Sequence, residues 1–251
     1  MELDTIYNED CLVGMARLPD KSIDCIICDL PYGTTANKWD IVIPFDLLWE
    51  QYRRISKPNA AIVLFGQEPF SSMLRMSNPE WFRYDWYWKK TRFANYAQAP
   101  YMPIKDIEVI SVFSQGTIAA NSANKMNYFP QGLKECHIEV KDKPCSKNFR
   151  PNRKPQTYTR THSGFPHQLI SFPNGGKTDH PTQKPVDLIR YLIRTYSTPG
   201  DVILDNTIGS GTTAIACSKE KRHFIGFELS KEYFDKAQRR IKAEQSQLTL
   251  F

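Results

Sequence analysis

Val202-Ile-Leu-Asp-Asn-Thr-Ile-Gly-Ser-Gly-Thr-Thr213 is the most informative stretch of this 251-residue chain for its architecture. A short apolar run leads into a turn with two glycines, and a segment rich in small residues, Thr212–Lys219, follows. This order is typical of the strand, glycine turn and helix of a nucleotide-binding unit, because glycine lets the backbone approach a ligand closely. The third glycine that helps to cradle a pyrophosphate is missing, so we expect a cofactor without phosphates.

Apolar runs and helical patterns alternate over most of the chain. Ile189, Leu192, Ile193 and Tyr196 repeat with the spacing of one helix face, and Pro185 stands where a helix begins. Strands that alternate with helices predict an α/β fold with a doubly wound, mostly parallel sheet. Seven strands are predicted: Thr5–Asn8, Ile23–Cys28, Ala60–Phe65, Trp81–Lys89, Ile107–Phe113, Val202–Asp205 and His223–Phe227.

Residues 114–179 interrupt this alternation. They contain six prolines and little periodicity, so we predict an irregular insertion at the rim of the sheet. Ten basic and four acidic residues lie between Lys134 and Lys184, a net charge of +6, which equals the net charge of the whole chain. A basic excess confined to one stretch favours contact with a polyanion, and a solvated loop is the alternative.

Composition also excludes some classes of protein. No apolar run approaches the roughly 18 residues that a membrane span needs, and the acidic start Met-Glu-Leu-Asp lacks a signal-peptide core, so we expect an intracellular protein. Cys25 and Cys28 lie three positions apart in a predicted strand and would face opposite sides of it. No second pair at zinc spacing follows, so we expect reduced core thiols and no metal site.

Two acidic residues accompany the glycine turn. Glu228 follows the predicted strand His223–Phe227, where an acidic residue typically accepts hydrogen bonds from ribose hydroxyls. Asp205 and the N–H groups at the start of the next helix could hold the zwitterionic end of an amino-acid cofactor.

Asp29-Leu-Pro-Tyr32 follows a predicted buried strand directly and so belongs at the carboxyl edge of the sheet, where ligands bind in such folds. An aromatic amine is a poor nucleophile because its lone pair is delocalised into the ring. A carboxylate, Asp29, and the carbonyl of Leu30 could accept both of its N–H bonds and aim the lone pair at an electrophile. Pro31 would stiffen the turn, and Tyr32 offers a ring on which a base could stack. An ordinary Pro-Tyr-Gly turn is the alternative.

Three motifs of this sequence, at 29–32, 180–185 and 204–213, resemble those of the amino-group DNA methyltransferases. Asp29 to Tyr32 is similar to their D-P-P-Y motif, and Leu204 to Thr213 is similar to the motif that binds S-adenosylmethionine (AdoMet). His180-Pro-Thr-Gln-Lys-Pro185 resembles a further motif of the family. With the catalytic motif first, the order is that of the β group, and the resemblance spans nearly the whole chain.

The resemblance implies a seven-stranded, Rossmann-like methyltransferase sheet formed by residues 1–113 and 180–251, with 114–179 as the region that recognises double-stranded DNA. A bacterial or phage-encoded, cytoplasmic enzyme of the restriction–modification type is expected, and a homodimer is conceivable. It implies that six residues hold AdoMet: Asp10, Thr182, Asp205, Gly209, Gly211 and Glu228.

The chain departs from the family pattern at two places. Leu30 replaces the usual first proline, and Asn206-Thr207 replaces the usual Pro-Phe beside the cofactor. Enzymes that act on cytosine usually have Ser where this chain has Asp29, so the expected target is adenine N6. A cytosine-N4 or RNA methyltransferase, and a catalytically silent nucleic-acid-binding partner, are the alternatives.

Other segments give weaker indications. Phe65-Gly-Gln67-Glu-Pro-Phe70 should help to line the pocket. A DNA groove could be lined by Trp86, Trp88, Lys89, Lys90 and Arg92, although the alternation along Trp81–Lys89 puts half of them in the core. His162 and His167, in the basic insertion, could meet phosphate or simply occupy a loop. Gln247-Leu248-Thr-Leu250-Phe251 resembles the peptide with which bacterial proteins dock on the replicative sliding clamp, and a frayed tail is the alternative.

Overall fold

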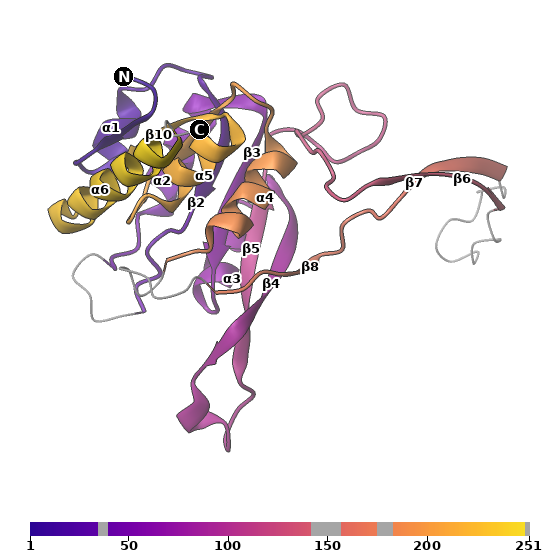
Figure 1. The fold of residues 1–251 in the computed structure, drawn as a ribbon, viewed down its shortest axis with the longest axis horizontal. Helices are drawn as coiled ribbons and strands as arrows, with labels where there is room; N and C mark the ends of the chain where they lie inside the picture. Colours follow the sequence, from indigo (N-terminus) through magenta and orange to yellow (C-terminus); the bar gives the residue numbers. More distant parts are fainter. Residues whose placement is uncertain (35–39, 142–156, 175–182, 249–251) are drawn as a thin grey trace. The chain divides into compact units, whose positions relative to one another are not determined.

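A computed structural model describes residues 1–34, 40–141, 157–174 and 183–248 (Figure 1). The chain forms two compact units, and the larger one combines Met1–Phe129 with Gln168–Phe251. The smaller unit, Pro130–His167, lies within the segment in which an insertion was predicted. Each unit is described below by itself.

The larger unit is built on an eight-stranded sheet, and all seven predicted strands are present in it. Neighbouring strands are parallel except where β5 pairs with β3 and with β4. The prediction of a doubly wound, mostly parallel α/β fold is therefore confirmed. In spatial order the strands are β1 (Thr5–Tyr7), β10 (His223–Phe227), β9 (Val202–Asp205), β2 (Ile23–Cys28), β3 (Ser56–Gly66), β5 (Lys105–Phe113), β4 (Phe82–Ala94) and β8 (Leu169–Ser171).

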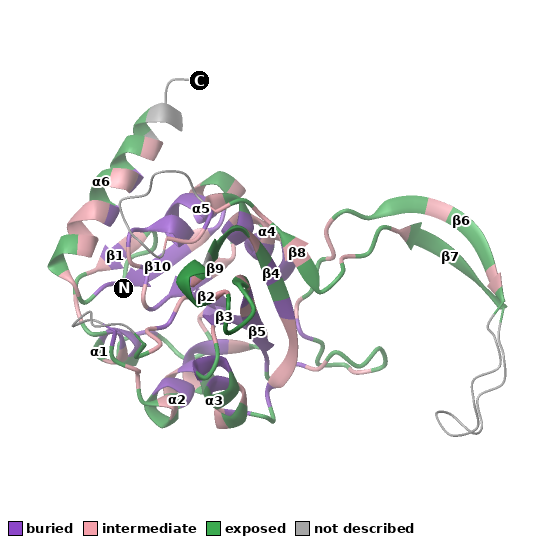
Figure 2. Cartoon of the chain, turned by 90° about the horizontal axis from the view of Figure 1, so that it is seen from below, coloured by how far each residue is buried: buried purple, intermediate pink, exposed green. Residues whose placement is uncertain are grey.

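Three strands lie where the sequence predicted only irregular structure. β8 adds a short parallel edge to β4, while β6 (Lys134–Lys141) and β7 (Thr157–Ser163) form an antiparallel ribbon in the smaller unit. Nearly every residue of this ribbon is exposed, as the green strands of Figure 2 show. In β6, Cys136, Ile138 and Val140 alternate with polar residues, which is a strand signal that the sequence reasoning missed. β7 has no such row of apolar residues.

Helices cover both faces of the sheet in the larger unit (Figures 1 and 2). One apolar cluster joins one face to α1 (Cys11–Ala16), α2 (Phe45–Ile55) and α3 (Phe70–Ser77). A second cluster joins the other face to α4 (Val186–Tyr196), α5 (Thr212–Glu220) and α6 (Lys231–Leu248). The sheet is thus buried on both sides, as parallel sheets require. No helix in the described ranges has the length and apolar character needed to cross a membrane.

β2 lies at the centre of this arrangement, and all six of its residues are buried. Cys25 packs into the cluster on one face and Cys28 into the cluster on the other, and both are free thiols, as predicted. β2 pairs in parallel with β9, so Ile26 faces Leu204. Since parallel strands end at the same edge of a sheet, the turn that follows β2 and the glycine turn that follows β9 lie next to each other.

Candidate active site

A cavity of about 520 Å³ opens at the carboxyl ends of β2 and β9. Its volume lies in the range of small-molecule binding sites, roughly 300–1,000 Å³. Gly211 is not part of its lining, and Thr182 lies outside the described residues. The lining brings together eight of the site residues predicted from the sequence: Asp10, Asp29, Leu30, Pro31, Tyr32, Asp205, Gly209 and Glu228.

The glycine turn after β9 depends on backbone conformations that favour glycine. Gly209 and Gly211 have φ angles of +55° and +81°, and L residues with side chains rarely adopt such values. A Cβ at Gly209 would meet only the Thr207 carbonyl oxygen, at 3.9 Å, so the space in front of it is open. A Cβ at Gly211 would instead lie 3.1 Å from the Cβ of Ala237 in α6. Gly209 therefore faces the cavity, and Gly211 lets α6 pack against the turn.

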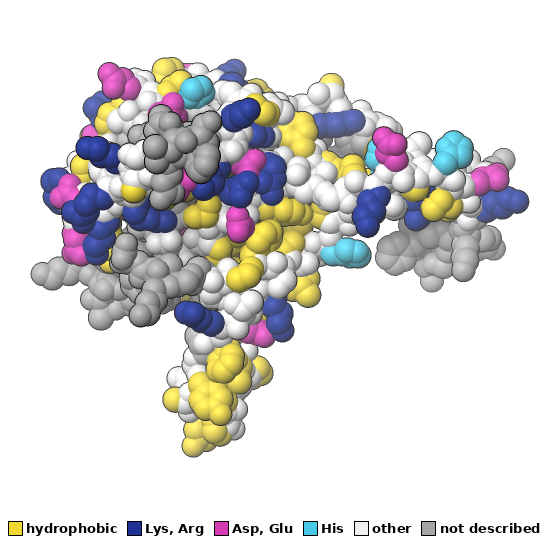
Figure 3. All heavy atoms as spheres, in the orientation of Figure 1, with side chains coloured by type: hydrophobic (Ala, Val, Ile, Leu, Met, Phe, Trp, Pro, Cys, Tyr) yellow, Lys and Arg dark blue, Asp and Glu magenta, His cyan; other side chains and the backbone are white. Residues whose placement is uncertain are grey.

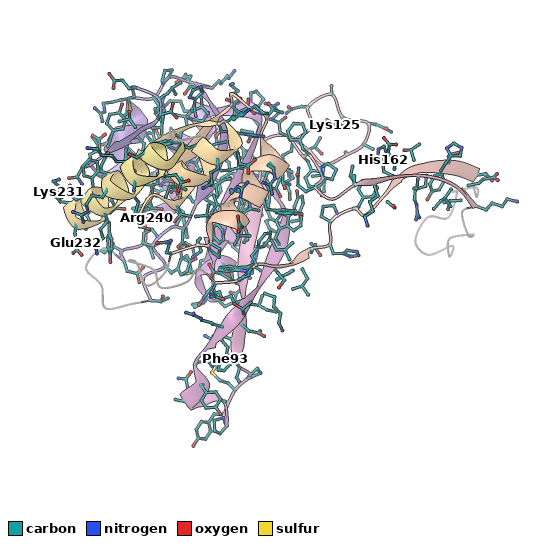
Figure 4. All side chains as sticks on the ribbon, viewed as in Figure 1. Phe93, Lys125, His162, Lys231, Glu232 and Arg240 are labelled. Carbon is teal, nitrogen blue, oxygen red and sulfur yellow. The ribbon has the colours of Figure 1, made fainter. Side chains whose placement is uncertain are left out.

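α6 also holds this turn through a charged side chain. The guanidinium of Arg240, which is labelled in Figure 4, donates hydrogen bonds to the carbonyl oxygen of Ser210 and, at 2.8 Å, to its hydroxyl. Ser210 lies between the two glycines, so the floor of the cavity is fixed from behind.

Acidic residues line the cavity beside the turn. The carboxylate of Glu228 accepts the N–H of Gly209 at 2.9 Å and the N–H of Ser230 at 2.8 Å, and burial raises its pKa. Asp10 caps the start of α1 by accepting the N–H of Leu12 at 2.8 Å. A carboxylate has about four acceptor positions, so both groups retain positions for ligand hydroxyl or amino groups.

Asp205 is buried more deeply, with 5% of its surface exposed. Its oxygens accept the hydroxyl of Thr213 at 2.6 Å and the N–H of Thr207 at 3.2 Å. Burial raises its pKa to about 6, although these hydrogen bonds oppose the shift. The side chain thus ties the end of β9 to the start of α5 and shapes the turn.

These residues fit AdoMet. The open space at Gly209, with backbone N–H groups at the start of α5 behind it, suits a charged amino-acid end without a phosphate. Apolar side chains complete the wall beside Glu228, as a flat adenosine requires: Phe227, Leu229 and Tyr233.

The catalytic turn occupies the other part of the same cavity. Asp29 is 27% exposed, and its Oδ1 accepts the hydroxyl of Tyr32 at 2.6 Å. The hydroxyl of Thr207 donates to the backbone carbonyl of Asp29 at 2.9 Å, so the cofactor turn and the catalytic turn are joined directly. The ring of Tyr32 packs against Phe70, with centroids 4.9 Å apart, and Phe65 and Gln67 line the cavity as predicted.

Asp29 belongs to a buried chain of alternating charges. Lys184 Nζ lies 2.6 Å from Asp29 Oδ2 and 2.8 Å from Glu108 Oε1, and Lys90 Nζ lies 2.5 Å from Glu108 Oε2. Lys184 and Glu108 are 10% and 3% exposed, so each charge depends on its partners rather than on water. This charge network therefore consists of two positive and two negative side chains in the cavity wall.

These contacts set the ionisation of the site. Burial raises the pKa of Asp29, and Lys184 opposes that rise. Burial would also raise the pKa of Glu108, but Lys184 and Lys90 together hold it below its usual value. Burial disfavours the ammonium of Lys184, yet Asp29 and Glu108 outweigh this effect and raise its pKa. Lys184 therefore stays charged, and its charge opposes protonation of Asp29.

Sequence reasoning did not single out this network. Lys184 was noted as part of His180-Pro-Thr-Gln-Lys-Pro185 and of the basic excess, and Glu108 only as part of a strand. The signal available was a charged residue inside an apolar strand, Asp-Ile-Glu108-Val-Ile, because such a residue usually has a buried partner. Trp86 and Trp88 are core residues, as predicted for half of their segment, and Lys90 belongs to the charge network.

The arrangement can direct an amino group toward a cofactor in the same cavity. The carboxylate of Asp29 and the carbonyl of Leu30 are hydrogen-bond acceptors in the cavity wall, and the Gly209 turn lies beside them. In the described part of the chain, no three His, Cys, Asp or Glu residues gather as metal ligands would.

Comparison with known proteins identifies the family of this chain. A family model for N6/N4 methyltransferases, described as DNA methylase, matches residues 23–239. The chain is 26% identical over 264 residues to DNA adenine methyltransferase YhdJ of Escherichia coli (strain K12), covering 96% of this chain and 83% of that protein. It is 25% identical over 256 residues to type II methyltransferase M.HpaI of Haemophilus parainfluenzae, covering 94% and 73%.

Solved structures agree with this assignment. The M1.HpyAVI–SAM complex has a TM-score of 0.61 and 26% identity, covering 94% of this chain and 98% of that chain. The cytosine-N4-specific PvuII DNA methyltransferase has a TM-score of 0.66 at 17% identity, covering 94% and 85%, and so shares the fold.

The family match begins in β2 and ends in α6, so it includes both the Asp29 turn and the glycine turn. The chain belongs to the N6/N4 DNA methylase family and is an AdoMet-dependent DNA methyltransferase.

Proposed function

We propose that the protein methylates N6 of an adenine that has left the DNA duplex and entered the cavity. The main support is the placement of Asp29, which lies in the cavity wall beside the cofactor turn and is kept ionisable by Lys184. The presence of Asp rather than Ser at position 29, and the similarity to a DNA adenine methyltransferase, favour adenine over cytosine.

In this proposal AdoMet, when bound, supplies an electrophilic methyl group, and residues of the chain prepare the nucleophile. Asp29 accepts one N–H of the adenine amino group and the Leu30 carbonyl accepts the other, which localises the nitrogen lone pair. Tyr32 provides a ring for the base, and its hydroxyl keeps Asp29 in place. The proton released from nitrogen passes to Asp29, whose raised pKa suits it to take a proton.

The proposed AdoMet site contains residues that face the ligand and residues that shape the turn. Its members are Asp10, Thr182, Asp205, Gly209, Gly211 and Glu228. Gly209 and Glu228 face the ligand, whereas Asp205 and Gly211 hold the turn in shape.

We further propose residues 114–179 as the target-recognition region and 1–113 with 180–251 as the catalytic domain. The support is the exposed ribbon of β6 and β7, a shape that the major groove of DNA admits. Lys134, Lys141 and Arg160 lie on this ribbon and would meet phosphates. His162, also on β7 and labelled in Figure 4, is a candidate for a base or phosphate contact.

Mass analysis of nucleosides tests the choice of base. DNA treated with the protein and AdoMet should yield N6-methyladenine, and sequencing of the methylated positions should give the target sequence. Asp29→Ala should abolish the product, whereas Asp46→Ala, which removes an exposed carboxylate at the start of α2, should not. N4-methylcytosine as the sole product would overturn the adenine proposal.

Two proposals concern partners. Gln247, Leu248, Leu250 and Phe251 form a candidate sliding-clamp peptide in a bacterial or phage setting, in which the enzyme would act in the cytoplasm. Gln247 and Leu248 end α6, and 249–251 lie outside the described residues. Unchanged clamp binding after deletion of 247–251 would overturn that proposal. The proposed homodimer is tested by measuring the mass of the protein in solution.

A further inference from the structure

The hairpin tip between β4 and β5, residues 91–105, carries large apolar side chains into solvent. Tyr101 is 90% exposed, Tyr96 is 71% exposed and Phe93 is 55% exposed. Figure 3 shows hydrophobic side chains gathered at the end of this hairpin, and Figure 4 places Phe93 on it. Scattered exposed apolar residues are normal, but several aromatic ones on one protrusion indicate a contact surface.

Hydrogen bonds and a defined turn give the hairpin tip a regular backbone. Asn95 adopts a left-handed conformation, and its Oδ1 accepts the N–H of Lys105 at 2.8 Å from the opposite strand. A 3₁₀ turn, Tyr96–Gln98, follows, and the carbonyl of Gln98 accepts the N–H of Tyr101 at 2.8 Å. The rings of Phe93 and Tyr96 lie 5.8 Å apart. Hydrogen bonds thus define the backbone of the tip, and the rings of Phe93 and Tyr96 lie near each other.

The base of the hairpin forms part of the catalytic cavity. Trp88 and Lys90 of β4 and Glu108 of β5 line the cavity. Asn174, which also lines it, accepts the N–H of Thr91 at 2.9 Å through its Oδ1. At about 3.3 Å per residue along a strand, Phe93 begins only about 10 Å beyond Lys90. The hairpin therefore extends directly from the wall of the cavity that would receive the target base.

The chemistry of the hairpin tip fits DNA. Residues 91–105 contain Arg92 and Lys105 and no acidic residue, so the tip is positively charged beside its aromatic rings. Aromatic side chains stack on bases of any sequence, and apolar wedges fill steps that open when a duplex is distorted. The major groove admits a two-stranded ribbon of this kind.

We infer that the β4–β5 hairpin tip is a DNA wedge that stacks Tyr96 and Tyr101 on bases left unstacked when the target base enters the cavity. The inference rests on the proposed function, because it requires a base that leaves the duplex. The wedge lowers the cost of extrusion and takes no part in methyl transfer itself.

The test compares two duplexes that carry the target sequence. In one, the target base is normally paired, and in the other it faces an abasic site, so that little opening is needed. Tyr96→Ala combined with Tyr101→Ala should lower kcat/KM at least about ten-fold on the paired duplex, the scale of lost base–aromatic stacking. On the second duplex the loss should be less than about three-fold. Tyr101→Trp, which retains a stacking ring, should behave as the wild-type protein does.

Three controls make the outcome decisive. Met76→Ala, which shortens a side chain of α3 that is 73% exposed, should change neither rate. Fluorescence of 2-aminopurine at the target position should report less extrusion by the double variant, without any catalysis. The sizes of the wild-type protein and the double variant in solution should be equal.

Equal rates of the double variant and the wild-type protein on the paired duplex would overturn the wedge, as would equal losses on both duplexes. A changed oligomeric state would also overturn it, because the tip would then contact a second copy. Failure of the wild-type protein to methylate either duplex would count against the proposed function itself.

Discussion

The hydroxyl of Thr207 donates a hydrogen bond to the backbone carbonyl of Asp29 over 2.9 Å, and the two residues are 178 positions apart in the sequence. Thr207 stands in the glycine turn, so this bond fixes the distance between the cofactor turn and the catalytic turn. It also gives a function to a departure from the family pattern, in which an aromatic residue is usual at this position. The neighbouring Asn206 is buried and accepts the hydroxyl of Tyr52 at 2.5 Å, so it too stabilises the turn from within.

Replacement of Thr207 by Val should slow methyl transfer with little effect on AdoMet affinity. The change keeps the side-chain shape and removes the hydrogen bond to the Asp29 carbonyl, worth about 1 kcal/mol, so a loss of about five-fold is expected in single-turnover rate. It also removes the 3.2 Å contact between the hydroxyl and Cys28 Sγ. Thr207→Ser retains the hydroxyl and should stay near the wild-type rate. A Val variant with the wild-type rate would show that the bond does not position Asp29.

Replacement of Lys184 by Met should move the acid limb of the rate–pH profile to higher pH. Lys184 opposes the rise in the pKa of Asp29, and without it Asp29 faces Glu108 alone, so protonated Asp29 persists to higher pH. On the acid limb, each unit by which the pKa of Asp29 rises should lower the rate about ten-fold, because the ionised fraction falls by that factor. Activity should partly return as pH rises.

A double variant separates this effect from simple damage to the fold. Lys184→Met with Glu108→Gln removes one positive and one negative charge, which leaves Asp29 without a carboxylate neighbour in the network. Its acid limb should return toward that of the wild-type protein. If Lys184→Met lowers the rate without moving the profile, Lys184 does not control the ionisation of Asp29.

Asp205 should make the protein less stable as pH rises from about 4 to 6. Its pKa in the folded protein is about 6 because of burial, and about 3.9 is usual in an unfolded chain. The folded state therefore binds more protons in this window, so the free energy of unfolding decreases with pH by roughly 3 kcal/mol in total. Urea denaturation should give the free energies of unfolding of the wild-type protein and of Asp205→Asn. The difference between the two free energies should change across this pH window and be constant above it. A constant difference at every pH would contradict the prediction.

Gly211→Ala should destabilise the protein more than Gly200→Ala does. Both glycines have positive φ angles, +81° and +89°, so each substitution should cost about 1–2 kcal/mol of backbone strain. A Cβ at Gly200 would meet nothing within 4 Å, whereas one at Gly211 would press on Ala237 of α6 at 3.1 Å. Roughly 1–3 kcal/mol more is expected from that overpacking. Equal urea midpoints for the two variants would show that α6 moves to accommodate the added Cβ without loss of stability.

The sequence predicted the parts of the fold that bury apolar residues in regular patterns. All seven predicted strands are present, because β2 and its neighbours are apolar and bounded by turns. β7 and β8 were missed because they are largely exposed and have no clear apolar period. β6 was missed although Cys136, Ile138 and Val140 alternate with polar residues. Pairing with β4, which is not a local property, makes a strand of Leu169–Ser171.

The candidate site was predicted where residues are continuous in sequence. Asp29 to Tyr32 and the glycine turn were identified because each is a short run with its own backbone chemistry. Lys184, Glu108 and Lys90 come from three separate segments, and only the folded sheet brings their charges together. No spacing rule could have paired them.

The strand order has a consequence for how the enzyme is made. β1 and β2 are synthesised first, but β10 and β9 lie between them in the sheet. A nascent chain therefore carries β2 with one edge unpaired until Val202–Asp205 has left the ribosome, and unpaired apolar edges favour aggregation. We expect that a chain interrupted during translation precipitates or is degraded, so that the cell acquires methylating activity only with nearly finished molecules.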